Sequence, residues 1–218
     1  ISAPILRGTN TINDIVLLLT SAGVAKFGRE QQPACEKVVI GYDSRVRGQD
    51  LAQLVAELFL HYGYTVYFFD EPGPYPVMTF AIPYEEIKGD IGILISASHN
   101  DYRYNGYKLS CCNGSQFDPE QRDQMYKQYI EQATLDDIGL MSFADALPDK
   151  LIFLGGEESV DEFDYMGRRD QVINIHQAHA DHVKTFLLTP DLAERQANSA
   201  DPLCIAYCAF HGAGRRAV

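Results

Sequence analysis

Residues 90–100 read DIGILISASHN, a short apolar run that ends abruptly in polar residues. Two earlier runs have the same character, Lys37–Asp43 (KVVIGYD) and Thr65–Asp70 (TVYFFD). Short continuous apolar runs of this kind are typical of strands buried on both faces of a sheet. We therefore predict three buried strands, the third of them over Asp90–Ala97.

The segments between and after these runs repeat apolar residues at helical spacing. Asn13 or Asp14 is placed to cap the first helix. The turn signals Asn105-Gly106 and Asn113-Gly114 bracket a strand of a hairpin, Tyr107–Cys111. Strands that alternate with helices predict a layered α/β sandwich domain with a mainly parallel mixed sheet. The predicted helices cover Ile12–Phe27, Gln49–Tyr62, a short stretch from Val77, Pro119–Ala133 and Asp170–Leu188.

The last part of the chain differs in character from the rest. Leu203–Phe210 (LCIAYCAF) is a new apolar run that follows a polar stretch, and we interpret it as the first strand of a second similar domain. We accordingly predict one domain over residues 1–190, then a linker and the truncated start of another over 191–218. Because the sequence begins at Ile1 and stops soon after a glycine-rich turn, we expect a fragment.

Charge and composition exclude several function classes. The formal net charge is −12 and the pI is near 4.8, which argues against nucleic-acid binding by clustered basic residues. No apolar run approaches 18 residues, so no membrane span is predicted. Five scattered cysteines without a CxxC pair indicate reduced thiols in a cytoplasmic protein. We expect Cys204 and Cys208, in the last apolar run, to be buried.

The polar end of residues 90–100 is the candidate for chemistry. Ser98 is followed by His99, and Lys108 lies ten residues further along, so a hydroxyl, an imidazole and an ammonium could meet. Ligand sites gather at the carboxyl ends of strands in open α/β sheets. An activated serine, a phosphorylated serine and a polar loop without chemistry all remain open. Ala97 and His99 replace the glycines of the G-x-S-x-G elbow, which disfavours a serine hydrolase.

The same residues resemble the active-site serine loop of the phosphohexomutase family, T-A-S-H-N-P followed by N-G-x-K. Asp101 stands here where the family has proline. Tyr107 in the second motif resembles the phosphoglucomutase/phosphopentomutase branch. Further segments that resemble the family, in order, are Leu6-Arg7-Gly8, Gly41–Arg45 (GYDSR), Asn113–Gln116 and His211–Gly214.

This resemblance implies an enzyme of the isomerase class that moves phosphate within a sugar monophosphate. Ser98 would be the phosphoserine, passing its phosphate to the sugar to form a bisphosphate. The implied products are sugar 1-phosphates and 6- or 5-phosphates, with glucose or pentose favoured over mannose. The implied cofactors are Mg²⁺, held here through the phosphate on Ser98, and glucose 1,6-bisphosphate as activator. The alternative is a catalytically inactive relative that acts as a phosphorylatable scaffold, which Asp101 favours.

The implied site residues fall into two groups. We predict catalytic roles for Ser98, His99, Lys108 and Arg7, and contacts to substrate or phosphate for Asn100, Arg45 and Gly8. Arg45 could instead be an ion-pair partner of Asp43. The family's metal loop and sugar-reading segments are not in this sequence, so the fragment alone is expected to be inactive. Its ligands are sugar phosphates, and its oligomeric state is not predicted.

Two other features have simpler interpretations. His176, His179 and His182 are spaced along one helix, which permits a surface metal site but favours a solvated helix face. The acidic segment Gly155–Asp164 is predicted to be a solvated loop.

Overall fold

The computed structural model describes residues 2–157, 160 and 163–215. Within this part of the chain, seven strands form one sheet in the order β1-β5-β4-β2-β3-β6-β7. The neighbours from β4 to β7 are parallel, whereas β5 runs antiparallel to β4 and β1 antiparallel to β5. The mixed, mainly parallel α/β class is therefore confirmed. The strands are β1 (Ser2–Pro4), β2 (Lys37–Tyr42), β3 (Thr65–Phe69), β4 (Ile91–Ile95), β5 (Tyr104–Cys111), β6 (Leu151–Gly155) and β7 (Ile173–Asn174).

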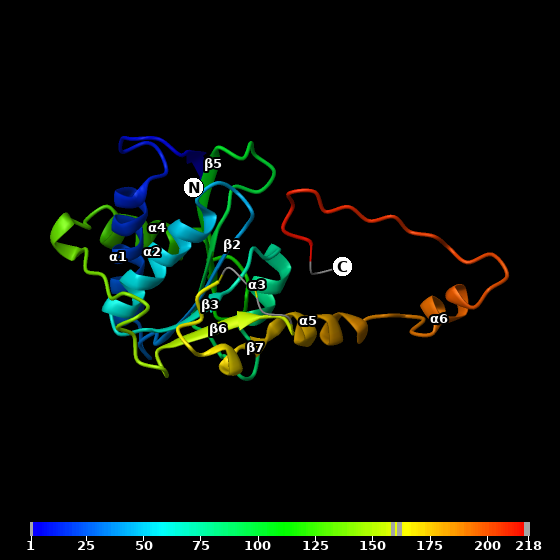
Figure 1. Cartoon of the computed structure of the whole chain (residues 1–218). Coiled ribbons are helices and arrows are strands. Elements are labelled where there is room, and N and C mark those ends of the chain that lie inside the picture. The colour runs from blue at the N-terminus through cyan, green and yellow to red at the C-terminus, as the bar shows by residue number, and fades with distance from the viewer. Residues whose placement is uncertain (1, 158–159, 161–162, 216–218) are drawn as a thin grey trace.

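Helices cover both faces of the sheet (Figure 1). One face packs against α1, α2 and the α4 segment, and the other against α3 and α5, so that two apolar cores flank the buried strands. The predicted cap is present, because the Asn13 side chain accepts a hydrogen bond of 3.0 Å from Val16 N. The helices are α1 (Asp14–Glu30), α2 (Gly48–His61), α3 (Tyr75–Ala81), α4 (Pro119–Met125), α5 (Ile175–Lys184) and α6 (Leu192–Ala197).

The strand order fixes where a site can form. From β2 the chain crosses through α2 to β3 on one side, and from β3 it crosses back through α3 to β4 on the other side. The carboxyl ends of β2 and β4 therefore lie side by side at the point where the order reverses. This is where open α/β sheets build their ligand sites.

Several sequence predictions are wrong in detail. Asn105-Gly106 is not a turn but lies inside β5, where Asn105 and Gly106 face Ala3 and Ser2 of β1. The helix predicted over Pro119–Ala133 is α4 followed by a π-helical turn, Tyr126–Ile130. The start of the predicted 170–188 helix is instead a 3-10 turn and β7.

The region between α4 and α5 contains structure that the sequence did not indicate. Leu151–Gly155 forms β6 beside β3 and extends the sheet. The predicted solvated loop begins after it, and four of its residues (158–159 and 161–162) lie outside the described part of the chain.

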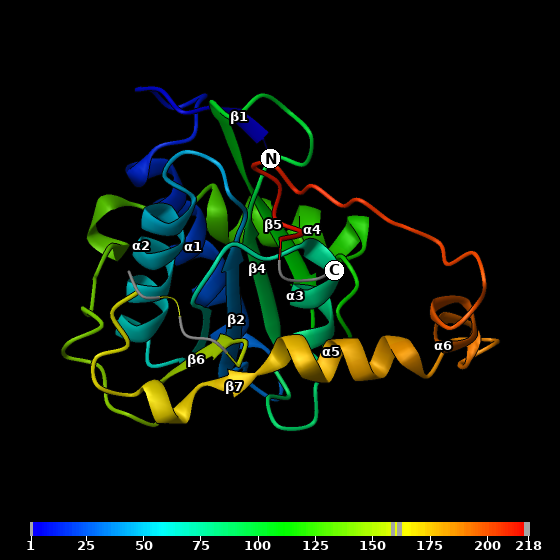
Figure 2. The same ribbon diagram turned by 45° about the vertical axis from the view of Figure 1, so that its right-hand side comes forward.

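The C-terminal segment leaves the body through α5 and α6 and then returns toward it (Figure 2). Leu203–Phe210, predicted as a strand, is not one, because none of the strands in the described ranges pairs with it. Cys204 and Cys208 are exposed rather than buried, and all five cysteines are free thiols, as predicted. The domain boundary at residue 190 stays a prediction. No helix in the described residues is long and apolar enough to cross a membrane.

Candidate functional site at the ends of β2 and β4

The first polar residues after β2 and β4 contact each other. Tyr42 and Ile95 are paired across the two strands, and Asp43 N then donates a hydrogen bond of 3.2 Å to Ile95 O. Ser96, which is buried, donates from Oγ to Asp43 Oδ2 at 2.7 Å. The segments that follow β2 and β4 are thus joined by a charge-assisted hydrogen bond between Ser96 and Asp43, at the point where the strand order reverses.

Ser98 lies at the tip of the loop that follows β4. Its amide donates to Ser96 Oγ at 3.2 Å, and its side chain is exposed. Its φ of +57° is in the left-handed region, which residues with a Cβ rarely adopt. A left-handed serine held at an exposed strand end is the kind of strained position that clusters at functional sites.

The Arg45 guanidinium is buried under the Ser98 loop. Nε donates to Asp43 Oδ2 at 2.9 Å. The ion pair with Asp43, which was one of the two roles predicted for Arg45, is therefore present. Nη2 donates to Ser98 O at 2.6 Å. Nη1 is within hydrogen-bond distance of three further carbonyl oxygens, those of Asn100, Asp101 and Tyr104, at 3.0, 2.9 and 3.1 Å. The phosphate-binding role of Arg45 is not tested by this arrangement.

The N-terminal segment lies beside the same loop. Ile5 N donates to Arg103 O at 2.9 Å, and Asn100 Nδ2 donates to Ser2 Oγ at 3.1 Å. Arg7 and Gly8 follow in an exposed turn that Thr11 and Asn13 hold by bonds to the carbonyls of Leu6 and Gly8, and Gly8 has a φ of +118°. The structure therefore brings the segment carrying Arg7 and Gly8 to the edge that carries Ser98.

His99 and Lys108 are placed differently from each other. His99 is exposed and directly follows Ser98. Lys108 lies on β5 opposite Leu94, and its Nζ is 5.3 Å from the centre of the Tyr75 ring. In the described residues, no hydrogen bond joins Lys108 to Ser98. The contact with Tyr75 was not predicted, because residues 33 positions apart carry no local signal of it.

Asp101, the departure from the family pattern, has its own counter-ion. Arg103 donates from Nε to Asp101 Oδ1 at 2.8 Å and from Nη2 to Oδ2 at 3.2 Å. Hydrogen bonds from the Arg103 side chain and backbone lower the pKa of this carboxyl, with the Arg45 charge adding to the effect. The extra carboxylate beside Ser98 is therefore ionised and paired.

Other polar groups lie at neighbouring strand ends. Asp70, buried at the end of β3, accepts a hydrogen bond of 2.8 Å from the Tyr165 hydroxyl. Ser44 Oγ donates to the carbonyl of His211, so the C-terminal turn reaches the same edge of the sheet as Arg45. The pairing across the strand ends of Asp43 with Ser96 was missed by sequence reasoning, although each is the first polar residue after its strand.

The histidines of α5 differ in exposure, from His182, which is exposed, to His176, which is nearly buried. The His176 side chain is 10% exposed, with Nε2 3.5 Å from Glu71 Oε1, and the His179 and His182 rings pack against Phe80. The preferred interpretation is thus wrong for His176. No cluster of three metal-ligating side chains occurs in the described ranges, here or around Ser98.

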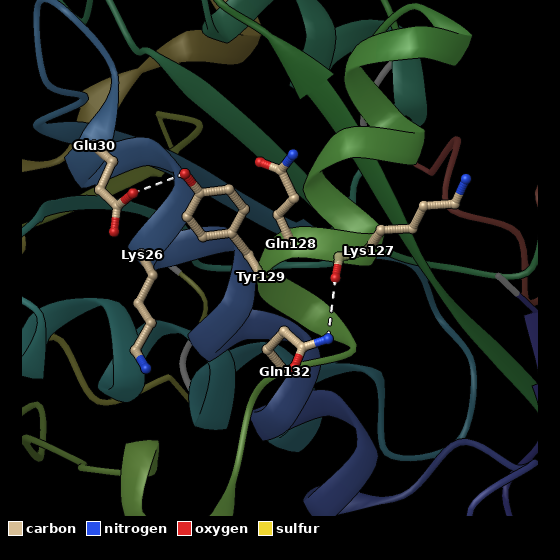
Figure 3. A pocket seen from close by; sticks show the side chains of 6 residues that line it. All are labelled: Lys26, Glu30, Lys127, Gln128, Tyr129 and Gln132. Carbon is tan, nitrogen blue, oxygen red and sulfur yellow. Dashed lines mark hydrogen bonds between the residues drawn. The ribbon is translucent and has the colours of Figure 1, made fainter.

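A hollow of about 580 Å³ lies at the other end of the molecule, over the last turns of α1 and the π-helical turn (Figure 3). Two of its charged groups already have partners: Lys26 Nζ is 2.5 Å from Asp137, and Tyr129 donates to Glu30 at 2.7 Å. Because α1 ends where the chain turns back to start β2, this hollow is at the opposite edge from Ser98. It is not part of the candidate site.

Comparisons with known proteins agree with this arrangement. A family model described as phosphoglucomutase/phosphomannomutase, alpha/beta/alpha domain I, matches residues 5–136. The chain is 32% identical to a phosphoribomutase of Saccharomyces cerevisiae over 115 residues, which is 51% of this chain and 18% of that protein. It is 30% identical to the phosphopentomutase of Homo sapiens over 133 residues, 57% of this chain and 21% of the relative. The chain thus spans about one fifth of the length of these relatives.

Solved structures share the fold at lower identity. An open-form phosphoglucomutase from Paramecium, pp63/parafusin, superposes with a TM-score of 0.60 at 16% identity, covering 90% of this chain and 38% of that one. A phosphoglucomutase/phosphomannomutase family protein from Burkholderia thailandensis gives 0.56 at 17% identity, with 86% and 34% covered. At such identities the likeness establishes the fold alone.

Proposed function

The chain belongs to the phosphoglucomutase/phosphomannomutase family through its alpha/beta/alpha domain I, and on that premise we propose that it is the phosphoserine-bearing part of a sugar-phosphate mutase. The bond between Ser98 Oγ and phosphorus breaks as a hydroxyl of a sugar monophosphate forms a new bond to phosphorus. The proton of that hydroxyl passes to a base, and the departing Ser98 Oγ takes up a proton from an acid. The bisphosphate then returns its original phosphate to Ser98, so that a sugar 1-phosphate becomes a 6- or 5-phosphate, or the reverse.

The conformation of Ser98 is the observation that carries this proposal. Its hydroxyl is exposed at the switch point of the sheet, on a left-handed residue whose amide and carbonyl are both hydrogen-bonded. Phosphoryl transfer depends mainly on positioning and on neutralising charge. A phosphate here adds about −1.5 to −2 charge at neutral pH. We assign its cations to the exposed Arg7 and to Lys108, and the proton transfers to His99 or Lys108.

Magnesium does not fit the described residues by themselves. They contain no group of three side chains that could hold it, and within them we assign the phosphate on Ser98 as the ligand. We derive no step through the metal, and we take glucose 1,6-bisphosphate as the source of the first phosphate.

The sugar and the compartment are further parts of the proposal. Relatives named phosphoribomutase and phosphopentomutase support a pentose phosphate as the substrate, and relatives named phosphoglucomutase support a glucose phosphate. We place the protein in the cytoplasm, which keeps thiols reduced, because all five of its cysteines are free.

The scaffold alternative rests on Asp101, whose charge would oppose a phosphate on Ser98. The bidentate contact with Arg103 offsets that charge, and this supports the mutase. The two functions still differ in one respect: a mutase exchanges the phosphate with sugar phosphates, and a scaffold does not.

The test is mass spectrometry of the Ser98 peptide, using the protein as its gene encodes it, with any residues outside these 218. Incubation with glucose 1,6-bisphosphate and Mg²⁺ is expected to add one phosphate, which glucose 1-phosphate or ribose 1-phosphate then removes. Ser98→Ala is expected to abolish uptake, and Ser199→Ala, in the exposed C-terminal segment, to leave it unchanged. A folded protein that never takes up phosphate contradicts the mutase, and one that keeps it in the presence of sugar phosphates favours the scaffold.

A further inference from the structure

Arg45 occupies the space beneath the Ser98 loop rather than the surface above it. Its side chain is 8% exposed, and the ion pair with Asp43 balances its charge. A guanidinium has five N–H donors in one plane. Here Nε donates to a carboxylate oxygen of Asp43 and Nη2 to the Ser98 carbonyl, while the two N–H groups of Nη1 are shared among the carbonyls of Asn100, Asp101 and Tyr104.

From this geometry we propose that Arg45 is a positioning residue, which holds Ser98 in the conformation that accepts phosphate, and is not itself a ligand of the phosphate. The inference rests on the proposed function for its catalytic meaning. Its structural part, that one guanidinium orders residues 98–104, stands on the contacts alone.

The four carbonyls show why the loop needs a cation at its centre. Their oxygens carry partial negative charge and all point at one side chain, so without that side chain they would repel one another. The carbonyls of Ser98, Asn100 and Tyr104 would lose the donor described here, whereas Asp101 O would keep its bond from Tyr104 N. The carbonyl of Ser98 is fixed by the shortest of these bonds, at 2.6 Å. Because a left-handed φ is disfavoured for an L-residue, Ser98 is expected to leave it when this restraint is lost.

The positions of the acceptors also argue against Arg45 as a ligand of the phosphate. Its donors are directed at main-chain oxygens and at Asp43, all on the inner side of the loop, whereas Ser98 itself is exposed. A phosphate on Ser98 would therefore draw its cations from residues on the outer side. Asp43 and Ser96 complete the arrangement, since Ser96 Oγ donates to the carboxylate that holds Nε and accepts from the Ser98 amide.

Lysine is the informative replacement. Arg45→Lys retains the positive charge and can retain a contact with Asp43, but an ammonium on a flexible stem cannot span four carbonyls as a planar guanidinium does. A phosphate ligand would tolerate this change better than a residue that orders a loop. Arg47→Lys is the matched control, because Arg47 lies two residues away and pairs with Asp14 at 2.8 Å without contacting the loop.

The experiment is hydrogen exchange combined with phosphate uptake on the same variants. Within the loop, Asn100 N donates to Ala97 O at 3.1 Å and Tyr104 N donates to Asp101 O at 2.9 Å. In Arg45→Lys we expect these amides to exchange about tenfold faster, the effect of losing one charge-assisted hydrogen bond. We expect phosphate uptake at Ser98 from glucose 1,6-bisphosphate to fall about a hundredfold through misplacement of Oγ. Arg47→Lys should match the wild type in both.

Three outcomes decide the proposal. Unchanged exchange in residues 98–104 with reduced uptake would make Arg45 a phosphate ligand and overturn it. Faster exchange with normal uptake would also overturn it, because the loop order would then be irrelevant to transfer. If the wild type takes up no phosphate, the proposed function fails, while the exchange comparison still tests whether Arg45 orders the loop. Hydrogen exchange of the α1 amides shows whether each variant is folded. If Arg45→Lys does not fold, Asp43→Asn replaces it, because loss of the Asp43 charge should loosen the same loop.

Discussion

Ser98 has a left-handed φ, which is sterically unfavourable for a residue with a Cβ. The cost of this conformation can be measured from protein stability, without an assay of activity. A left-handed φ costs a residue with a Cβ about 1–2 kcal/mol, a cost that glycine does not bear. Against this, glycine loses about 0.4–1 kcal/mol relative to alanine through the greater freedom of its unfolded chain. Ser98→Gly is therefore expected to be more stable than Ser98→Ala by about 0.5–1 kcal/mol. Urea denaturation of the two variants gives the difference directly.

The matched control is the same pair of substitutions at Ser44. Ser44 is exposed in the neighbouring loop and does not have a positive φ. There the order should reverse, with the alanine variant more stable. An alanine variant that is the more stable one at position 98 as well would show that Ser98 is not held in the left-handed region.

Sequence reasoning at the scale of single residues proposed Ser98 as the candidate for chemistry and offered the ion pair between Asp43 and Arg45, since both lie in short motifs. The ion pair is present, and the role of Ser98 stays a prediction. Sequence reasoning could not find the convergence of four carbonyls on Arg45, because main-chain oxygens leave no trace in side-chain identity. It also missed the placement of Lys108 over Tyr75, which depends on how α3 packs against β5.

At the scale of elements, α1 and the π-helical turn Tyr126–Ile130 approach unusually closely at Gly23. A Cβ built on Gly23 would lie 2.6 Å from the Ile130 Cα, a main-chain atom that cannot move aside as a flexible side chain can. Gly23→Ala is expected to destabilise the protein by about 1–2 kcal/mol. This is the overpacking cost of about 1–3 kcal/mol, reduced by up to about 1 kcal/mol through the better helix propensity of alanine.

The control for that substitution is Gly73→Ala. A Cβ on Gly73 would meet its nearest neighbour, Phe69 Cδ1, at an ordinary 3.7 Å, and Gly73 has no positive φ. Its effect on the free energy of unfolding should stay within about 0.5 kcal/mol. Equal effects at the two positions would mean that α1 and the π-helical turn do not pack as described.

Helices and strands were predicted well where a local pattern of apolar residues defines them. They were predicted poorly where pairing with a neighbouring strand determines the structure. The strands β2, β3 and β4 are continuous apolar runs, which is what burial on both faces requires. Strands β1 and β7 are three and two residues long and exist through their neighbours, so no periodicity could reveal them. Asn105-Gly106 has turn chemistry, yet pairing with β1 keeps both residues in a strand, and Gly106 O also accepts a hydrogen bond from Ser96 N, just after β4.

At the scale of the whole molecule, the body and the C-terminal segment differ in how much they bury. Leu203–Phe210 is apolar enough to be predicted as a strand, but Ile205 is 77% and Phe210 is 88% exposed. A lone extended segment leaves its amide and carbonyl groups without strand partners, so apolar content by itself does not make a strand. The prediction failed because it assigned a partner sheet that the described residues do not contain.

This difference predicts the pattern of limited proteolysis. Trypsin is expected to cut first after Lys184 and Arg195, both exposed on the segment that leaves the body. Arg195 pairs with Asp191, in a contact exposed on both sides that contributes about 0.3–0.5 kcal/mol. Arg168 is the internal control, because it lies outside any helix or strand yet its guanidinium donates to Ala146 O and Leu151 O at 2.8 and 3.2 Å.

The trimmed body should unfold with a free energy within about 0.5 kcal/mol of the whole chain, since residues beyond 184 bury little that cleavage would expose. Mass spectrometry of the digest and urea denaturation of the product measure both expectations. Cutting after Arg168 as fast as after Arg195, or a body that unfolds once trimmed, would place the C-terminal segment inside the cooperative unit. Early cuts confined to residues 184–195 would instead support a domain boundary near residue 190, with the Ser98 loop on the folded side of it.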